Sequence, residues 1–167
     1  DGFMNPDYEV KAEDGWYDVE VPRSWTRYED CGDWDYSIYT NTQMPWQEGD
    51  NASVPQAPTN YNPVGFYRKE FTVKPSMLQD NGRVLISFQG VESAYYVYVN
   101  GHEVGYSEDS YRPHEFDITD YLNPQGEVNT LAVEVHKFCD GTWMEDQDMI
   151  YDGGIFRDVY LYSTPLV

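Results

Sequence analysis

Two acidic runs are the first candidates for chemistry in this sequence. The acidic residues of the first run are Asp30, Asp33 and Asp35, and those of the second are Asp140, Glu145, Asp146 and Asp148. Clustered carboxylates can bind a hard cation such as Ca²⁺, Mg²⁺ or Na⁺, or act as the acid and nucleophile of a glycosidase. Neither run has EF-hand spacing. A solvated loop is the alternative interpretation of the first run. For the last three residues of the second run, the alternative is structural pairing with Arg157 and backbone amides.

Other catalytic constellations are missing from the sequence. No G-x-S-x-G motif marks a nucleophilic serine, and His102, His114 and His136 lie apart without zinc-ligand spacing. Gly153-Gly154 is a lone glycine pair before a strand, not a phosphate-binding loop. The sequence therefore argues against a triad hydrolase, a zinc enzyme and a nucleotide-binding protein.

The charge balance narrows the range of partners. Ten Lys and Arg against 30 Asp and Glu give a net charge of −20, which repels nucleic acid and anionic lipid. No apolar run approaches the roughly 18 residues of a membrane-spanning helix. We therefore expect neither a nucleic acid nor a membrane as partner, and a neutral sugar is compatible with this surface.

The two cysteines, Cys31 and Cys139, lie far apart and neither is in a C-x-x-C motif. We expect two reduced thiols, with a single long-range disulfide as the alternative. The cysteines leave the compartment open.

The elements that must position these residues change character near residue 65. Residues 1–63 are rich in turn formers and aromatics, which indicates long loops with short extended pieces around 17–21 and 37–39. Apolar and polar residues alternate afterwards, as in half-buried strands. The predicted strands cover residues 66–73, 83–89, 94–99, 102–106, 115–118, 129–137 and 156–162, and residues 76–79 are predicted to form one helical turn.

These strands predict the fold class. Asn100-Gly101 between two alternating runs is a strong hairpin signal, because both turn residues must adopt positive φ. Seven short strands without a long helix are typical of an all-β antiparallel β-sandwich, or jelly roll. A chain of 167 residues is long enough for one such domain with its own core. The tyrosines at 95, 96 and 98 fit either cross-strand packing or a sugar-stacking platform.

Residues 140–158 carry a specific resemblance. They read Asp-Gly-Thr-Trp-Met-Glu-Asp-Gln-Asp-Met-Ile-Tyr-Asp-Gly-Gly-Ile-Phe-Arg-Asp. This resembles the glycoside hydrolase family 2 β-galactosidase pattern Asp-Gly-Ser/Thr-x-x-Glu-Asp-Gln-Asp-Met-Trp, followed by Ser-Gly-Ile-Phe-Arg-Asp-Val. Ile150 stands where the pattern has Trp, and Gly153 where it has Ser. Further similar segments, in the same order, are Val21-Pro22-Arg23-Ser24-Trp25, Tyr39-Thr40-Asn41, Asn62-Pro63-x-Gly65-x-Tyr67, Gly90-Val91-x-Ser93-Ala94 and Glu115-Phe116-Asp117.

The resemblance implies that residues 1–167 form a single sugar-binding jelly roll, galactose-binding-domain-like, within a larger chain. In that family, immunoglobulin-like domains and a catalytic barrel follow, and the barrel holds both catalytic glutamates. We therefore expect no catalytic residue here. The implied partners are a β-galactoside and the rest of the parent chain. Any Mg²⁺ cofactor would be bound by the missing barrel.

The resemblance also implies two site residues. Asn41, in the Tyr-Thr-Asn loop, and Asp140, which opens the Asp-Gly segment, match residues that contact galactosyl hydroxyls. Asp140 further matches a ligand of a sodium ion. The alternative is that Asn41 caps a turn and that Asp140-Gly141 is only a type I′ or II turn.

Two other functions remain open from the sequence. One is an autonomous, non-catalytic carbohydrate-binding module with an aromatic platform, formed by Trp16, Trp34, Trp46 or the strand tyrosines. The other is a purely structural module that packs on a catalytic barrel. The run Asp-Gly…Glu-Asp-Gln-Asp resembles β-galactosidases more than glucuronidases or mannosidases.

Overall fold

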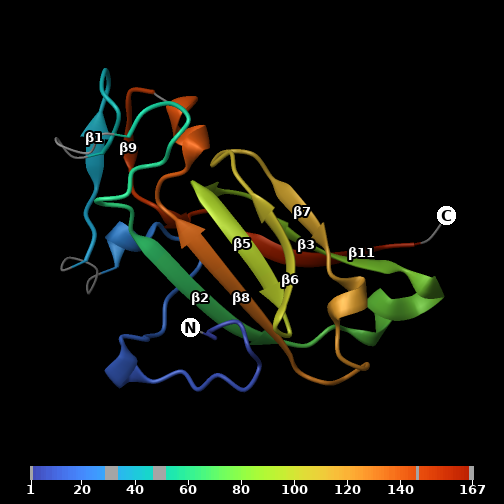
Figure 1. Ribbon diagram of the computed structural model, residues 1–167. Helices are drawn as coiled ribbons and strands as arrows, with labels where there is room; N and C mark the ends of the chain where they lie inside the picture. Colours follow the sequence, from blue (N-terminus) through green and yellow to red (C-terminus); the bar gives the residue numbers. More distant parts are fainter. Residues whose placement is uncertain (1, 29–33, 47–51, 146, 166–167) are drawn as a thin grey trace.

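The computed structural model describes residues 2–28, 34–46, 52–145 and 147–165. Two antiparallel sheets form the body of the molecule (Figure 1). The larger has the order β2-β8-β5-β6, with β2 (Val64–Phe71), β8 (Asn129–His136), β5 (Ala94–Val99) and β6 (His102–Ser107). The smaller has the order β11-β3-β7, with β11 (Val159–Thr164), β3 (Arg83–Phe88) and β7 (His114–Asp117).

Two short ribbons flank these sheets. In one, β1 (Ile38–Thr40) pairs with β9 (Met149–Tyr151), and in the other β4 (Val91–Glu92) pairs with β10 (Gly154–Ile155). The helices of the described residues are 3₁₀ segments, and none is long enough to cross a membrane. Their bounds are η1 (Ala12–Asp14), η2 (Trp25–Arg27), η4 (Pro75–Asn81), η5 (Thr119–Tyr121) and η6 (Asp140–Trp143).

The core lies between the two sheets and follows from the alternation of the strands. Successive strand side chains point to opposite faces, so every second residue reaches the interior. From β3, β5 and β8 these buried residues are Val84, Ile86, Phe88, Tyr95, Val97, Val99, Val133 and Val135. Each fully buried aliphatic or aromatic side chain contributes roughly 1.5–3 kcal/mol to folding. The predicted all-β antiparallel sandwich is confirmed.

The predicted strands are confirmed, and six of the seven have bounds within two residues of those observed. The last begins at Val159, three residues later than expected. Asn100 (φ 51°) and Gly101 (φ 83°) both adopt the left-handed conformation that their hairpin requires. The segment 17–21 lies in a loop, as expected of the first 63 residues: it joins none of the described sheets, and Tyr17, Val19 and Val21 are 37–44% exposed.

Candidate functional site

Asn41 directly follows strand β1 and is exposed. The ribbon of β1 and β9 holds this strand end in place, with Thr40 opposite Met149 and Ile38 opposite the buried Tyr151. The Tyr39 hydroxyl donates a hydrogen bond of 2.7 Å to the Asp148 carboxylate. That hydrogen bond raises the pKa of Tyr39.

Asp140 is the first residue of η6 and is also exposed. It follows the end of β8, and the Thr142 hydroxyl accepts a 3.0 Å hydrogen bond from the Cys139 amide at the base of the turn. The Asp140-Gly141 dipeptide therefore opens a 3₁₀ helix, and not the type I′ or II turn of the alternative interpretation. A Cβ on Gly141 would lie 2.6 Å from Glu108 Oε2, so the Glu108 carboxylate would have to shift to admit a side chain there.

Aromatic contacts bring the loop after Asn41 onto η6. The rings of Trp46 and Trp143 are 4.6 Å apart, and the Trp46 ring is 6.0 Å from that of Phe138. Trp143 Nε1 also donates a 2.9 Å hydrogen bond to the Gln56 carbonyl. The chain segments that carry Asn41 and Asp140 are therefore packed together, at the end of the sandwich where β1 and β9 lie (Figure 1).

Asp35, the last residue of the first acidic run, is buried and does not lie in a solvated loop. Asp35 is 3% exposed and accepts hydrogen bonds of 2.8 and 2.9 Å from Lys137 Nζ. The indole of Trp25 and the hydroxyl of Tyr61 also donate to its carboxylate. Burial raises the pKa of the Tyr61 hydroxyl, and its hydrogen bond to Asp35 adds to the rise. Asp30 and Asp33 lie outside the described residues.

The second run contains a structural carboxylate at Glu145. It accepts hydrogen bonds from the amide (2.7 Å) and the hydroxyl (2.8 Å) of Ser110. The expected pairing with backbone amides is thus confirmed for Glu145, whereas neither Glu145 nor Asp148 pairs with Arg157, which donates to the Tyr111 carbonyl at 2.8 Å and lies over the Phe156 ring. Asp148 is exposed and accepts from Tyr39. Asp146 lies outside the described residues.

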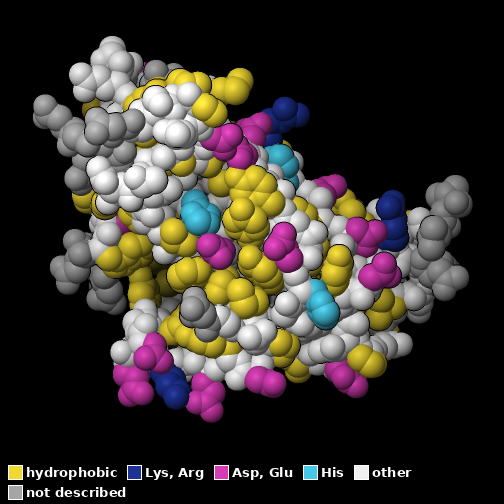
Figure 2. Space-filling model, viewed as in Figure 1, with side chains coloured by type: hydrophobic (Ala, Val, Ile, Leu, Met, Phe, Trp, Pro, Cys, Tyr) yellow, Lys and Arg dark blue, Asp and Glu magenta, His cyan; other side chains and the backbone are white. Residues whose placement is uncertain are grey.

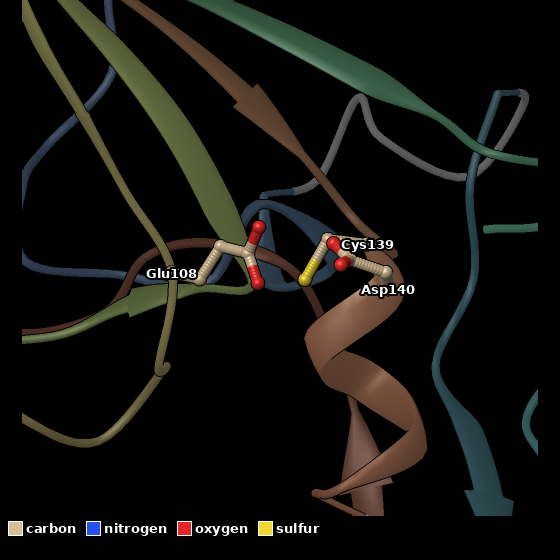
Figure 3. A group of neighbouring side chains, drawn as sticks. All are labelled: Glu108, Cys139 and Asp140. Carbon is tan, nitrogen blue, oxygen red and sulfur yellow. The ribbon is translucent and has the colours of Figure 1, made fainter. Parts of the chain in front are cut away.

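The structure adds Glu108 to the surroundings of Asp140. The ligand atoms of Glu108, Cys139 and Asp140 lie within 4.8 Å of one another, and Figure 3 shows the two carboxylates turned toward each other on either side of the sulfur. Cys139 is a free, buried thiol, and burial raises its pKa, so it is protonated at neutral pH. Two carboxylates suit a hard cation, whereas a neutral thiol does not. Cys31 lies outside the described residues.

The three tryptophans considered for a sugar platform each pack on another aromatic ring. Trp16 lies 5.9 Å from Tyr8, Trp34 lies 5.4 Å from Trp25, and Trp46 lies 4.6 Å from Trp143. Among the strand tyrosines, Tyr95 is buried in the core, and Tyr96 stands directly opposite Tyr106 with ring centroids 4.7 Å apart. Cross-strand packing therefore accounts for Tyr96 and core packing for Tyr95, while the Tyr98 ring lies 5.9 Å from that of Phe3.

A large groove of the described structure lies elsewhere. It has a volume of about 1830 Å³ and is lined by the N-terminal segment together with β2, β3, β8 and β11. Figure 2 shows part of this hollow, lined by apolar side chains beside the N-terminal segment. Neither Asn41 nor Asp140 lines it. Both predicted residues are exposed, on a part of the surface other than this groove.

The sequence of the chain matches a known family over almost its whole length. The family model described as "Glycosyl hydrolases family 2, sugar binding domain" matches residues 5–165. The chain belongs to this family. This sugar-binding domain is 52% identical over 165 residues to a β-galactosidase of Priestia megaterium, covering 99% of the chain and 15% of that protein. It is 48% identical to a β-galactosidase of Clostridium acetobutylicum, covering 95% of the chain and 17% of that protein.

Solved structures agree on the fold of the sugar-binding domain. A β-glucuronidase of Bacteroides uniformis superposes with a TM-score of 0.67 at 22% identity, covering 98% of the chain and 16% of that structure. A β-glycosidase from Bacteroides vulgatus superposes with a TM-score of 0.60 at 24% identity, covering 98% of the chain and 18% of that structure. The chain thus spans about one sixth of the length of the relatives that it matches.

Proposed function

We propose that this sugar-binding domain is part of a retaining β-galactosidase, in which Asn41 and Asp140 bind the galactosyl group while a separate barrel carries the catalytic residues. The relatives that match almost the whole chain are β-galactosidases, and the chain spans only about one sixth of their length. One observation carries the site assignment. Asn41 and Asp140 are both exposed on segments that pack together, yet they lie outside the large groove. Such an open pair is suited to complete a site whose other walls belong to another part of the parent chain.

The side-chain chemistry agrees with a neutral sugar as ligand. The Asn41 amide can donate to one hydroxyl and accept from another, whereas the Asp140 carboxylate accepts only. Hydroxyl groups bind such partners through directional hydrogen bonds without charge neutralisation. In this domain the two residues bind and orient the sugar. Acid catalysis and nucleophilic attack belong to the carboxylates of the barrel, because a retaining mechanism needs two carboxyl groups about 5–5.5 Å apart across the scissile bond.

The proposal includes a sodium ion at Asp140. The carboxylates of Glu108 and Asp140 fit a hard cation, since their oxygens lie within 4.8 Å of each other. When bound, the ion supplies a Lewis-acidic contact for a sugar hydroxyl. Asp140 is the residue that holds it, and Glu108 adds negative charge beside it. Any Mg²⁺ belongs to the barrel.

The test is the variant Asp140→Asn in the parent enzyme. Loss of a charge-assisted hydrogen bond costs roughly 1.5–3 kcal/mol, so kcat/KM for a nitrophenyl galactoside should fall about 10- to 150-fold. Replacing sodium by choline should lower kcat/KM of the wild type and leave the variant unchanged. Asp120→Asn, an exposed aspartate in η5, is the matched control and should retain wild-type rates. A normal kcat/KM in Asp140→Asn would rule out the site assignment.

Asn41→Ala gives an independent check, with a similar loss in kcat/KM expected and no loss of sodium dependence. Calorimetric titration of the isolated chain with galactose and lactose separates this proposal from an autonomous carbohydrate-binding module. No heat of binding is expected, because the other walls of the site are missing. Saturable binding at low-millimolar strength or better would favour the autonomous module.

A further inference from the structure

An ion pair between Asp35 and Lys137 is completely buried where two site segments begin. Both side chains are 0% exposed, and the residues are 102 positions apart in the sequence. Lys137 directly follows β8 and precedes Asp140 by three residues. Asp35 precedes β1, which ends next to Asn41. The pair therefore joins the segment that leads to Asn41 to the segment that leads to Asp140.

Each partner of the pair has its hydrogen bonds fixed in direction. Lys137 Nζ donates to both Asp35 oxygens and, at 2.7 Å, to the Tyr36 carbonyl. An ammonium group has three N–H donors, so Lys137 has a partner for each. Asp35 also accepts from the Trp25 indole and the Tyr61 hydroxyl. Neither side chain can shift without breaking several of these contacts in a dry interior.

Two further hydrogen bonds fix the chain next to Lys137. The Asn62 side chain accepts a 2.9 Å hydrogen bond from the Phe138 amide and donates one of 2.9 Å to the Phe138 carbonyl. Asn62 is the neighbour of Tyr61, which binds Asp35. Three stretches of chain, around residues 35, 61 and 137, are thereby held in one register just before Asp140.

We infer that Asp35 and Lys137 are positioning residues of the galactosyl site, which set the place of Asn41 relative to Asp140. This inference rests on the proposed function. A buried ion pair is a poor source of stability, because desolvation of both charges offsets their attraction, and apolar residues of similar volume often serve as well. What such a pair supplies is one geometry, because its hydrogen bonds are directional and an apolar contact can slide. Displacing a ligand-binding group by about 1 Å weakens its contact with the ligand. The fixed geometry of the Asp35–Lys137 pair therefore matters here, because two loops must contact the same sugar.

The test is a paired replacement in the parent enzyme, Asp35→Leu with Lys137→Met. It removes both charges and approximately keeps the volume, so the melting temperature should stay near that of the wild type or rise. The value of kcat/KM for a nitrophenyl galactoside should nevertheless fall at least tenfold, with a higher Ki for galactose. Ile118→Ala, a fully buried core residue beside η5, is the control that loses stability and should retain kcat/KM below its melting temperature.

A double-mutant cycle shows whether the pair acts through the site. The factor by which the paired replacement lowers kcat/KM should be at least fivefold smaller in an Asp140→Asn background than in the wild type. The reason is that Asp140→Asn has already removed one of the two sugar contacts that the ion pair positions. An equal cost in both backgrounds would overturn the inference. So would a stable paired variant with wild-type kcat/KM while Asp140→Asn lowers that value. If Asp140→Asn itself has no effect, the proposed function fails instead.

Tyr61→Phe covers the case in which the paired replacement does not fold. It removes one hydrogen bond to Asp35 and no packing volume. We expect a three- to tenfold rise in KM with an unchanged circular dichroism spectrum. Wild-type KM and kcat in this variant would contradict the positioning role.

Discussion

The indole of Trp25 occupies the space that a side chain on Gly153 would need. A Cβ on Gly153 would overlap the six-membered ring of Trp25, and Gly153 also has a φ of +78°. The Trp25 amide in turn donates a 3.1 Å hydrogen bond to the Gly153 carbonyl. A serine at this position would meet both obstacles. The glycine is thus a consequence of how the Trp25 ring is packed, with 2% of that residue exposed.

Gly153→Ala should destabilise the protein strongly. Positive φ costs about 1 kcal/mol for a residue with a Cβ, and overpacking adds about 1–3 kcal/mol. We expect a loss of about 2–4 kcal/mol in the free energy of unfolding, measured by urea titration with tryptophan fluorescence. Gly126→Ala is the matched control, since Gly126 has φ +89° but open space around its Cβ position. Equal losses in the two variants would show that the Trp25 ring yields.

Asn100 should stabilise the protein through its side-chain hydrogen bonds as well as through its left-handed backbone conformation. Its side chain donates to the Tyr121 carbonyl and to Asn129 Oδ1, and accepts from the Thr130 amide, each at 2.8 Å. Asn100→Gly keeps the left-handed turn but loses these bonds, worth about 0.5–1.5 kcal/mol each. We expect Asn100→Gly to lose about 2 kcal/mol of unfolding free energy, and Asn100→Ala about 1 kcal/mol more. Should the alanine variant be the more stable of the two in thermal unfolding, backbone strain would not matter at this turn.

Glu92 is a buried acid whose charged form is disfavoured. Burial raises its pKa from 4.5 to about 7, against the lowering effect of hydrogen bonds from the amides of Gly153 and Asp152. Those amides contact one carboxyl oxygen, whereas the other, Oε1, is buried without a hydrogen-bond partner in the described structure. Asp152 nearby raises the pKa further, and Lys137 lowers it. Near pH 6 the folded protein therefore holds a proton on Glu92.

This proton makes stability depend on pH in a defined direction. Because the folded pKa is above the unfolded value, the folded state binds more protons between pH 4.5 and about 7, and its stability falls as the pH rises through that range. The rise of the Glu92 pKa from 4.5 to about 7 corresponds to roughly 3 kcal/mol in all. Glu92→Gln should remove this slope from a series of urea titrations at pH 4.5–8. An identical slope in the wild type and the variant would assign it to other groups.

Cys139 should be inert in the folded protein. It is 6% exposed, and burial raises the pKa of its thiol, so little reactive thiolate is present at neutral pH. In a Cys31→Ser variant, Ellman's reagent should label one thiol in urea and less than a tenth of that in native buffer over an hour. Fast labelling of the native variant would mean that the turn between β8 and η6 opens readily. Adding Cys139→Ser to the Cys31→Ser variant supplies the matched blank, which has no thiol.

The strands could be predicted because their signals are local. Val84, Ile86 and Phe88 recur at every second position, and this spacing alone places them on one face of a strand. Asn100-Gly101 similarly requires only the conformations of two adjacent residues. The short ribbon strands β4, β9 and β10 were not predicted. They span only two or three residues and form against partners distant in sequence.

The candidate site, like the fold, could be predicted only in part. The resemblance of the motifs to glycoside hydrolase family 2 singled out Asn41 and Asp140 as candidates, because it rests on runs of neighbouring residues. Only the tertiary structure decided that Asp35 is buried against Lys137 and that Glu108 lies beside Asp140. The reason is physical: alternation, turns and motifs depend on near neighbours, whereas a carboxylate takes its environment from whichever segments the packed core brings against it.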